Sequence, residues 1–168
     1  MITDQQSETT YNKTFRDVEM DAAKRKLPVS VLFVDDDVDI REQVSEMLGR
    51  VVAEVHTAEN GKEGLWKYME FSPDIVITDC KMPVMTGLEM AEQIRMLDRK
   101  VQIIVMSAYR DANELMELID VGICSYVVKP VADDKLLKAL EQCAAHVMQT
   151  RAKAKYESEL NEILSLFD

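Results

Sequence analysis

Four groups of polar residues that could do metal or phosphate chemistry share one local context, since each follows a short apolar run. The runs are 31–34, 75–78, 103–106 and 126–128, and the residues after them are Asp35, Asp36, Asp37, Asp79, Ser107 and Lys129. Short runs rich in β-branched residues are typical of buried parallel strands, whose carboxyl ends meet at the edge of a sheet where ligands bind. The pattern predicts a cluster of carboxylates with one ammonium and one hydroxyl, which suits a divalent metal and a phosphoryl group.

Repulsion among the acids is the reason to expect a cation between them. Two carboxylates about 4 Å apart repel each other by about 4 kcal/mol at an effective dielectric constant near 20. Mg²⁺ relieves this repulsion, using one or two carboxylates while it retains several waters. We expect Asp36 and Asp79 to bind Mg²⁺ directly and Asp35 to bind through a water, with Mn²⁺ as a substitute ion. Asp37 is expected to cap the helix that follows.

The same residues suit phosphoryl transfer. A carboxylate is a competent nucleophile toward phosphorus and forms an aspartyl phosphate. Lys129 and the metal would neutralise the charge on the transferred oxygens, and Ser107 would donate a hydrogen bond to the same group. An acyl phosphate is labile, so this chemistry favours a switch.

Five strands and the helices between them are needed to bring these residues together. We predict strands near 29–34, 51–56, 74–79, 101–106 and 123–129, separated by segments of helical periodicity. Cap residues followed three positions later by an acid support the helix starts: Asn60 with Glu63, Thr86 with Glu89, and Asp111 with Glu114. Gly49 and Gly122 stand where the first and fourth helices should stop. Alternating strands and helices predict an α/β fold with a parallel sheet covered on both faces.

The two ends of the chain extend beyond this pattern. Residues 1–28 are predicted to be a polar tail, helical from about 14 to 26. Residues 133–168 contain no Gly or Pro, so we predict one long helix. Its first apolar stripe, which should cover the sheet, is Leu137, Leu140, Ala144 and Val147. Its second stripe, half a turn out of phase, is Tyr156, Leu160, Ile163 and Phe167. The second stripe is expected to meet another protomer, the N-terminal tail or a further domain; a frayed amphipathic end is the alternative.

Composition excludes several classes of function. The net charge of −11 over 168 residues argues against binding to nucleic acid or to an anionic membrane. No stretch approaches the roughly 20 apolar residues that span a bilayer, and the polar N-terminus is unlike a signal peptide. Three cysteines without CxxC spacing predict neither a disulfide framework nor a zinc site. We therefore expect a soluble cytoplasmic protein.

Over residues 29–148 the chain resembles the receiver domain of bacterial two-component response regulators. The segments that carry the resemblance, in order and at the right spacing, are 31–37, 75–87, 105–108 and 126–130. The resemblance implies a flavodoxin-like (βα)5 sheet in strand order 2-1-3-4-5 with an extended C-terminal helix. It also implies domain limits of 1–28 for the tail, 29–148 for the receiver and 149–168 for a helical linker or coiled coil.

The resemblance assigns a role to each site residue. Asp79 is the phosphoacceptor, Asp35 and Asp36 are the metal-binding acid pair, and the backbone carbonyl of Lys81 completes the metal shell. Ser107 follows the phosphoryl group, Lys129 is the ammonium, and Tyr126 is the aromatic that changes rotamer on activation. The donor is a phosphohistidine on a sensor histidine kinase or phosphotransfer protein. Lys81 and Tyr109 lie two residues beyond the acceptor and the hydroxyl, and we predict that they slow dephosphorylation by crowding the attacking water.

Three other readings compete with this one. Asp35, Asp37, Asp39 and Glu46 mimic an EF-hand loop, but its sixth position is Ile40 where Gly is needed. A dehalogenase-type phosphatase would also use a strand-end aspartate, yet it leaves Asp79 unexplained. A module that only mediates interaction or dimerisation, with phosphorylation lost, is the third. The receiver reading expects a signalling domain without a separate turnover substrate, a homodimer through the C-terminal helix, or a downstream output domain.

Overall fold

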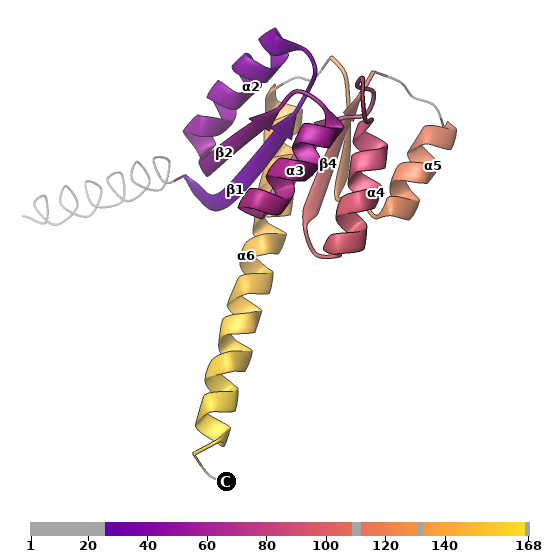
Figure 1. The fold of residues 1–168 in the computed structure, drawn as a ribbon. Helices are drawn as coiled ribbons and strands as arrows, with labels where there is room; N and C mark the ends of the chain where they lie inside the picture. Colours follow the sequence, from indigo (N-terminus) through magenta and orange to yellow (C-terminus); the bar gives the residue numbers. More distant parts are fainter. Residues whose placement is uncertain (1–25, 109–111, 131–132, 167–168) are drawn as a thin grey trace, which may run out of the picture.

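The five strands form one parallel sheet in the order β2-β1-β3-β4-β5, which confirms the predicted topology. The computed structural model describes residues 26–108, 112–130 and 133–166, and Figure 1 shows their arrangement. The strands are β1 Leu27–Val34, β2 Val52–Ala58, β3 Ile75–Asp79, β4 Gln102–Ser107 and β5 Ser125–Val128. The helices are α2 Val38–Val51, α3 Gly61–Phe71, α4 Gly87–Leu97, α5 Ala112–Val121 and α6 Asp133–Leu164.

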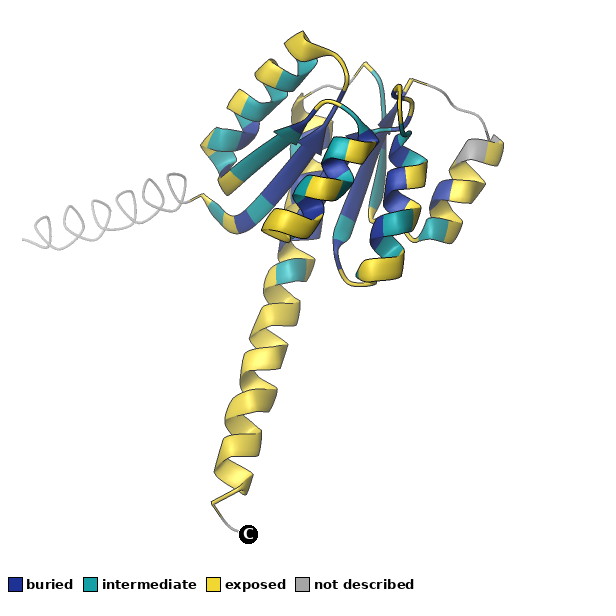
Figure 2. Cartoon of the chain, in the orientation of Figure 1, coloured by how far each residue is buried: buried dark blue, intermediate teal, exposed yellow. Residues whose placement is uncertain are grey.

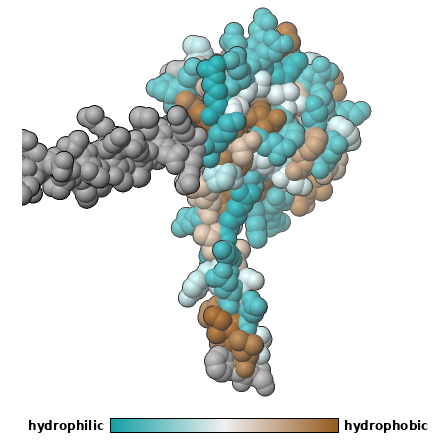
Figure 3. Space-filling model, turned by 90° about the vertical axis from the view of Figure 1, so that its left-hand side faces the viewer, coloured by the Kyte–Doolittle hydropathy of each residue, from teal (hydrophilic) through white to brown (hydrophobic). Residues whose placement is uncertain are grey.

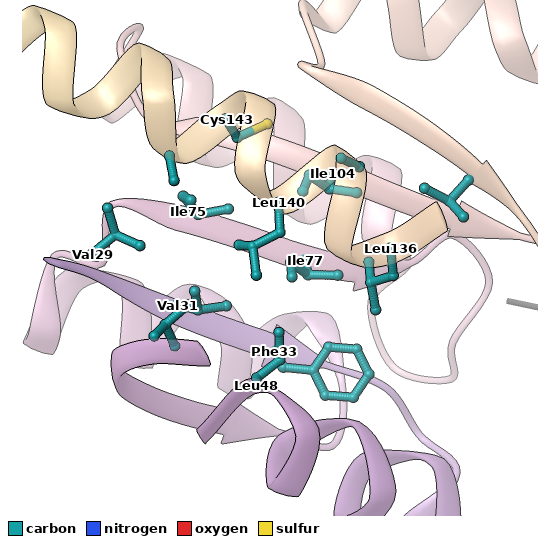
Figure 4. Packing of buried hydrophobic residues seen from close by; sticks show 14 of the residues in the cluster. Val29, Val31, Phe33, Leu48, Ile75, Ile77, Ile104, Leu136, Leu140 and Cys143 are labelled. Carbon is teal, nitrogen blue, oxygen red and sulfur yellow. The ribbon is translucent and has the colours of Figure 1, made fainter. Parts of the chain in front are cut away.

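Helices cover both faces of the sheet, and each face has its own core. Alternate residues of a strand point to opposite faces, so neighbours such as Leu32 and Phe33 belong to different clusters. One cluster joins Phe33 to Leu48 of α2 and Leu140 of α6; some of its members are drawn in Figure 4. The other joins Leu32 to residues of α3, α4 and α5. Because both faces are covered, the central strands β1, β3 and β4 contain continuous buried apolar runs, as the sequence indicated, whereas the edge strand β2 is only partly buried.

Local hydrogen bonds start three of the helices where the sequence predicts. Asp37 caps α2 by accepting from the N–H groups of Asp39 and Ile40, and Asn60 caps α3 by accepting from the N–H of Glu63. Thr86 and Glu89 form a reciprocal capping box at the start of α4. Gly122 follows the last residue of α5 with a φ of 78°, which confirms the predicted stop.

The predicted helix stop at Gly49 is wrong. The helix α2 continues through Gly49 to Val51, and the Val52 N–H donates to the Leu48 carbonyl at its end. Leu48 is fully buried, and β2 begins at Val52, directly after the helix. Packing of the last turn against the sheet therefore extends the helix past a residue that favours termination.

The helix α6 is one continuous element with two different halves. Leu140 and Ala144 of the predicted first stripe are buried, Leu137 and Val147 pack against the same core, and the structure adds Leu136, Ala139 and Cys143. Beyond Arg151 the helix projects away from the sheet, and the described residues of the predicted second stripe are exposed, as Figure 2 shows. The exposed large apolar residues here are Tyr156, Leu160, Ile163, Leu164 and Leu166, and Figure 3 shows hydrophobic atoms gathered near the end of the helix.

The prediction that the cysteines form no disulfide is wrong. Cys124, just before β5, is bonded to Cys143 of α6, with Cα atoms 6.6 Å apart. The two residues are 19 apart in the chain and have no motif spacing; they meet because α6 folds back along the sheet.

Some predictions fall on residues outside the described ranges. These are the helix within the N-terminal tail, the cap at Asp111, the position of Tyr109 and the last member of the second stripe, Phe167. Among the described residues, no helix is both long and apolar enough to cross a membrane.

Candidate functional site

The first acid of the site is held by the turn that links β1 to α2. Asp35 follows Val34, and its side chain is almost fully buried. Its N–H donates to the carbonyl of Ala58 at 3.2 Å, and its Oδ1 accepts from the Asp37 N–H at 3.0 Å. The guanidinium of Arg41 donates to the Asp35 carbonyl oxygen at 2.7 Å. Two contacts therefore fix the backbone of Asp35 at the sheet edge, and the third holds one oxygen of its carboxyl group.

The second acid, Asp79, ends β3 and is held between β4 and α4. The next residue, Cys80, donates its N–H to the carbonyl of Met106 at 2.9 Å and accepts from the Gly87 N–H at 2.9 Å. A Cβ atom at position 87 would collide with the backbone carbonyl oxygen of Asp79. Gly87 is therefore required by the close approach of α4 to the acceptor strand.

Lys129 joins the two acids. Its Nζ lies 3.2 Å from Oδ2 of Asp35 and 3.3 Å from Oδ2 of Asp79. Its backbone N–H donates to the carbonyl of Ser107 at 2.8 Å, which fixes the turn after β5 against the end of β4. The peptide bond from Lys129 to Pro130 is cis. A single ammonium therefore bridges the carboxylates at the ends of β1 and β3.

Asp36 completes a set of three carboxylates. One oxygen each from Asp35, Asp36 and Asp79 lies within 4.8 Å of the others, with Asp35 buried, Asp79 half-buried and Asp36 exposed. An all-oxygen donor set of acids is what Mg²⁺ or Mn²⁺ prefers. The exposed member leaves a path from solvent, so the residues present fit a divalent ion that keeps some of its waters.

Burial and charge shift the protonation equilibria of this cluster. Burial raises the pKa of Asp79, and the neighbouring Asp35 charge raises it further, which the ammonium of Lys129 only partly offsets. Burial disfavours the charge of Lys129, but the carboxylates of Asp79 and Asp35 outweigh burial and raise the pKa of Lys129. Without a metal the cluster is short of positive charge, since two close acids share one ammonium.

The remaining predicted residues lie around the same edge. Ser107 is buried at the end of β4, and Tyr126 of β5 is half-buried and packs against the core under α3, α4 and α5. Lys81 is exposed, two residues beyond Asp79. The described part of the site thus brings together the residues expected from the strand ends.

Sequence reasoning missed two supporting residues, Arg41 and Gly87. Arg41 lies near the start of α2, where the helix dipole disfavours a cation. A basic residue at this position indicates that its side chain bonds to a group outside the helix. Gly87 carried a weaker signal, because a glycine next to a cap residue is common without a close approach.

The fold and the site define a doubly wound α/β domain with an acidic cluster at the carboxyl edge of its sheet. A family model described as the response regulator receiver domain matches residues 31–141. The chain belongs to this family, so it is a signalling domain of the two-component type.

Individual relatives agree with this assignment. The chemotaxis protein CheY of Listeria monocytogenes is 38% identical over 69% of this chain and 98% of its own length. The regulatory protein AtoC of Escherichia coli is 28% identical over 80% of this chain, which spans only 28% of AtoC. Among solved structures, a CheX–CheY–BeF3–Mg²⁺ complex from Borrelia burgdorferi is similar with a TM-score of 0.64 at 28% identity, covering 68% of this chain and 87% of that chain.

Proposed function

We propose that the chain is a phosphorylation-controlled switch in which Asp79 accepts a phosphoryl group. The donor is a phosphohistidine on a sensor histidine kinase or phosphotransfer protein. The observation that carries the proposal is the pairing of Lys129 with both Asp35 and Asp79, at 3.2 and 3.3 Å. The ammonium lies beside the proposed nucleophile, where charge would build up on a transferred phosphoryl group.

The chemistry is a displacement at phosphorus. An Oδ atom of Asp79 attacks, the phosphorus–nitrogen bond of the donor breaks, and its electron pair returns to the donor imidazole. Asp79 is half-buried, so the phosphoryl group would be partly shielded from water. Lys129 would exchange one of its carboxylate contacts for a phosphoryl oxygen, and the hydroxyl of Ser107 would donate to another.

Mg²⁺, or Mn²⁺ in its place, would be held by Asp36 and Asp79, by Asp35 through a water, and by the backbone carbonyl of Lys81. When bound, the ion supplies positive charge that neutralises the acids and the phosphoryl oxygens. The three carboxylates within 4.8 Å of one another support this assignment. The relative from Borrelia burgdorferi was solved as a complex with BeF3 and Mg²⁺.

In this proposal, residues next to the site carry the effect of phosphorylation to the rest of the domain. Ser107 would move toward the phosphoryl group, and Tyr126 would change rotamer in the half-buried space behind it. Because the Lys129 N–H is bonded to the Ser107 carbonyl, movement of one residue is passed to the turn that precedes α6. Lys81 and Tyr109 would set the lifetime of the phosphoryl group by crowding the attacking water.

The chain is divided, in this proposal, into a tail (1–28), the receiver (29–148) and a helical extension (149–168). The exposed stripe on α6 would pair with a second copy or lead to an output domain. We expect the protein to act in the cytoplasm of a bacterium, without a separate turnover substrate, and to bind neither nucleic acid nor membrane through this segment. The net charge of −11 supports the last point.

Intact-mass analysis tests the central claim. Purified protein is incubated with Mg²⁺ and acetyl phosphate, and the expected product carries one phosphoryl group. Asp79→Asn should carry none, and chelation of Mg²⁺ should abolish the adduct on the wild type. Asp74→Asn is a matched control, because this aspartate lies at the other end of β3 and pairs with Arg151. An unmodified wild type, or an adduct that persists in Asp79→Asn, would refute the assignment.

The two alternatives have different signatures. A module that only mediates interaction would show no adduct but would keep its self-association. A dehalogenase-type phosphatase would turn over small phosphate esters steadily, and Asp35→Asn would stop it. Light scattering of the wild type and of Leu160→Ser tests the dimer; a monomer at high concentration, with or without phosphodonor, argues against it.

A further inference from the structure

The disulfide joins two cysteines in opposite surroundings. Cys143 is fully buried in the core between α6 and the sheet, where it is among the side chains drawn in Figure 4. Cys124 is exposed, immediately before the edge strand β5. Its backbone N–H donates to the carbonyl of Ile103 at 2.7 Å, so β4 holds its position independently of the disulfide. The bond therefore joins the buried face of α6 to the segment that leads into the edge strand β5.

The covalent ring closed by this bond contains much of the proposed switch. Its ends are 19 residues apart, and between them lie all of β5, Lys129 and the first turns of α6. Tyr126 also lies within the ring. A change at the disulfide thus acts on the segment that connects the acidic cluster to the terminal helix.

In the described part of the chain, α6 contacts the rest of the domain over residues 136–151. The buried residues of α6 end at Ala144. The last described contacts along the helix are those of Arg151, which donates to Asp74 at 2.6 Å and to the Pro28 carbonyl at 2.8 Å. Figure 2 shows that the helix beyond this point is exposed. The disulfide therefore adds a covalent link near the middle of the packed segment.

We propose that Cys124 and Cys143 form a reversible redox site whose oxidation locks α6 onto the sheet and whose reduction releases that restraint. The oxidant is a small disulfide of the glutathione class. The thiolate of Cys124, the exposed residue of the pair, attacks the small disulfide, forming a mixed disulfide and releasing one thiol. The Cys143 thiolate then attacks the sulfur of Cys124 and releases the second thiol, so two electrons and two protons pass to the glutathione pair. Reduction runs in reverse, with a small thiolate attacking the sulfur of Cys124 and releasing Cys143.

The asymmetry in exposure makes this order testable by thiol labelling. The native protein is first reduced and then treated with N-ethylmaleimide, and labels are located by mass spectrometry. We expect one label, on Cys124, because Cys143 and Cys80 are buried. Prior treatment with oxidised glutathione should abolish the label, lower the mass by two hydrogens and leave no glutathione attached; a reducing thiol should restore the label.

Two variants separate the steps. Cys143→Ala keeps a small apolar side chain in the core, and it should retain glutathione on Cys124 because the resolving thiol is gone. Cys124→Ser should be neither oxidised nor labelled in the native state. Wild type that retains glutathione on Cys124, or that forms only intermolecular disulfides, would overturn the proposal.

Amide hydrogen exchange measures the effect on the helix. Oxidation of the wild type should slow exchange of α6 amides around Cys143 by about tenfold to a hundredfold, since the closed loop limits detachment of the helix. Both variants should exchange at one rate regardless of glutathione. Equal rates in the oxidised and reduced wild type would overturn the claim that the bond restrains α6. None of these measurements needs a phosphoryl group, so they stand or fall separately from the function proposed for Asp79.

Discussion

Removing the ammonium of Lys129 should destabilise the metal-free fold through the acids that it bridges. Lys129→Met keeps the length of the side chain but leaves Asp35 and Asp79 without the cation that lies 3.2 and 3.3 Å away. Breaking one side of a buried ion pair costs about 3–5 kcal/mol. About a fifth of the Lys129 side chain is exposed, so we expect a smaller loss, about 2–4 kcal/mol.

Urea unfolding at pH 7 with a chelator, followed by far-UV circular dichroism, measures this loss. The same substitution in an Asp79→Asn background should cost about 1–2 kcal/mol less, because one of the two orphaned charges is absent. Saturating Mg²⁺ should restore much of the lost stability; a ligand at 100 times its dissociation constant contributes about 2.7 kcal/mol. Lys138→Met, at an exposed position of α6, is the matched control and should change stability by less than about 0.5 kcal/mol.

Two results would refute this reasoning. A loss for Lys129→Met no larger than that of the control would mean that the ion pairs contribute nothing. Equal losses with and without Asp79→Asn would mean that Lys129 does not interact with Asp79.

Three further predictions concern charge, packing and backbone. The fold raises the pKa of Asp79, so protonated Asp79 stabilises the fold below its ordinary pKa of 3.8, and this stability is lost as pH rises through the folded pKa. Urea titrations of the metal-free protein above pH 4 should show this loss of stability in the wild type but not in Asp79→Asn. Leu140→Ala should cost about 2–5 kcal/mol in urea unfolding, because Leu140 is fully buried between α6 and the sheet. Gly49→Ala should raise the free energy of unfolding by up to about 1 kcal/mol, since a Cβ atom there would meet nothing within 4 Å. Gly87→Ala should lower the free energy of unfolding, because its Cβ atom would collide with the Asp79 carbonyl.

Each of these has a clear contrary outcome. Parallel pH profiles for wild type and Asp79→Asn would show that Asp79 does not titrate abnormally. Leu140→Ala with a cost below about 1 kcal/mol would mean that α6 is not packed as described. Gly87→Ala as stable as Gly49→Ala would mean that α4 does not approach Asp79 closely.

Features that depend on a few neighbouring residues were predictable from the sequence. The caps at Asn60 and Thr86 are satisfied by groups three positions away, so their spacing alone indicates them. The central strands β1, β3 and β4 were recognisable because both faces of the sheet are covered there, which favours continuous apolar runs. The acids at the ends of β1 and β3 were predicted to converge because carboxyl ends of parallel strands share an edge.

Tertiary structure decided the features that depend on distant segments. Gly49 reads as a helix stop, but packing of Leu48 against the sheet carries α2 two residues further. The Cys124–Cys143 bond and the collision at Gly87 both arise where one element folds against another, which no local pattern records. The bond from Arg41 to the Asp35 carbonyl likewise depends on the shape of the turn between β1 and α2.

The acidic cluster shows which features the sequence determines and which depend on the tertiary structure. The sequence by itself determined which residue types end the strands, because each apolar run and the polar residue that follows it are neighbours in the chain. Only the folded sheet decided that Lys129 lies between Asp35 and Asp79, with 94 residues separating Lys129 from Asp35 along the chain. The physical reason is that local hydrogen bonding and burial select each element separately, whereas the distances between charges depend on how all the elements pack.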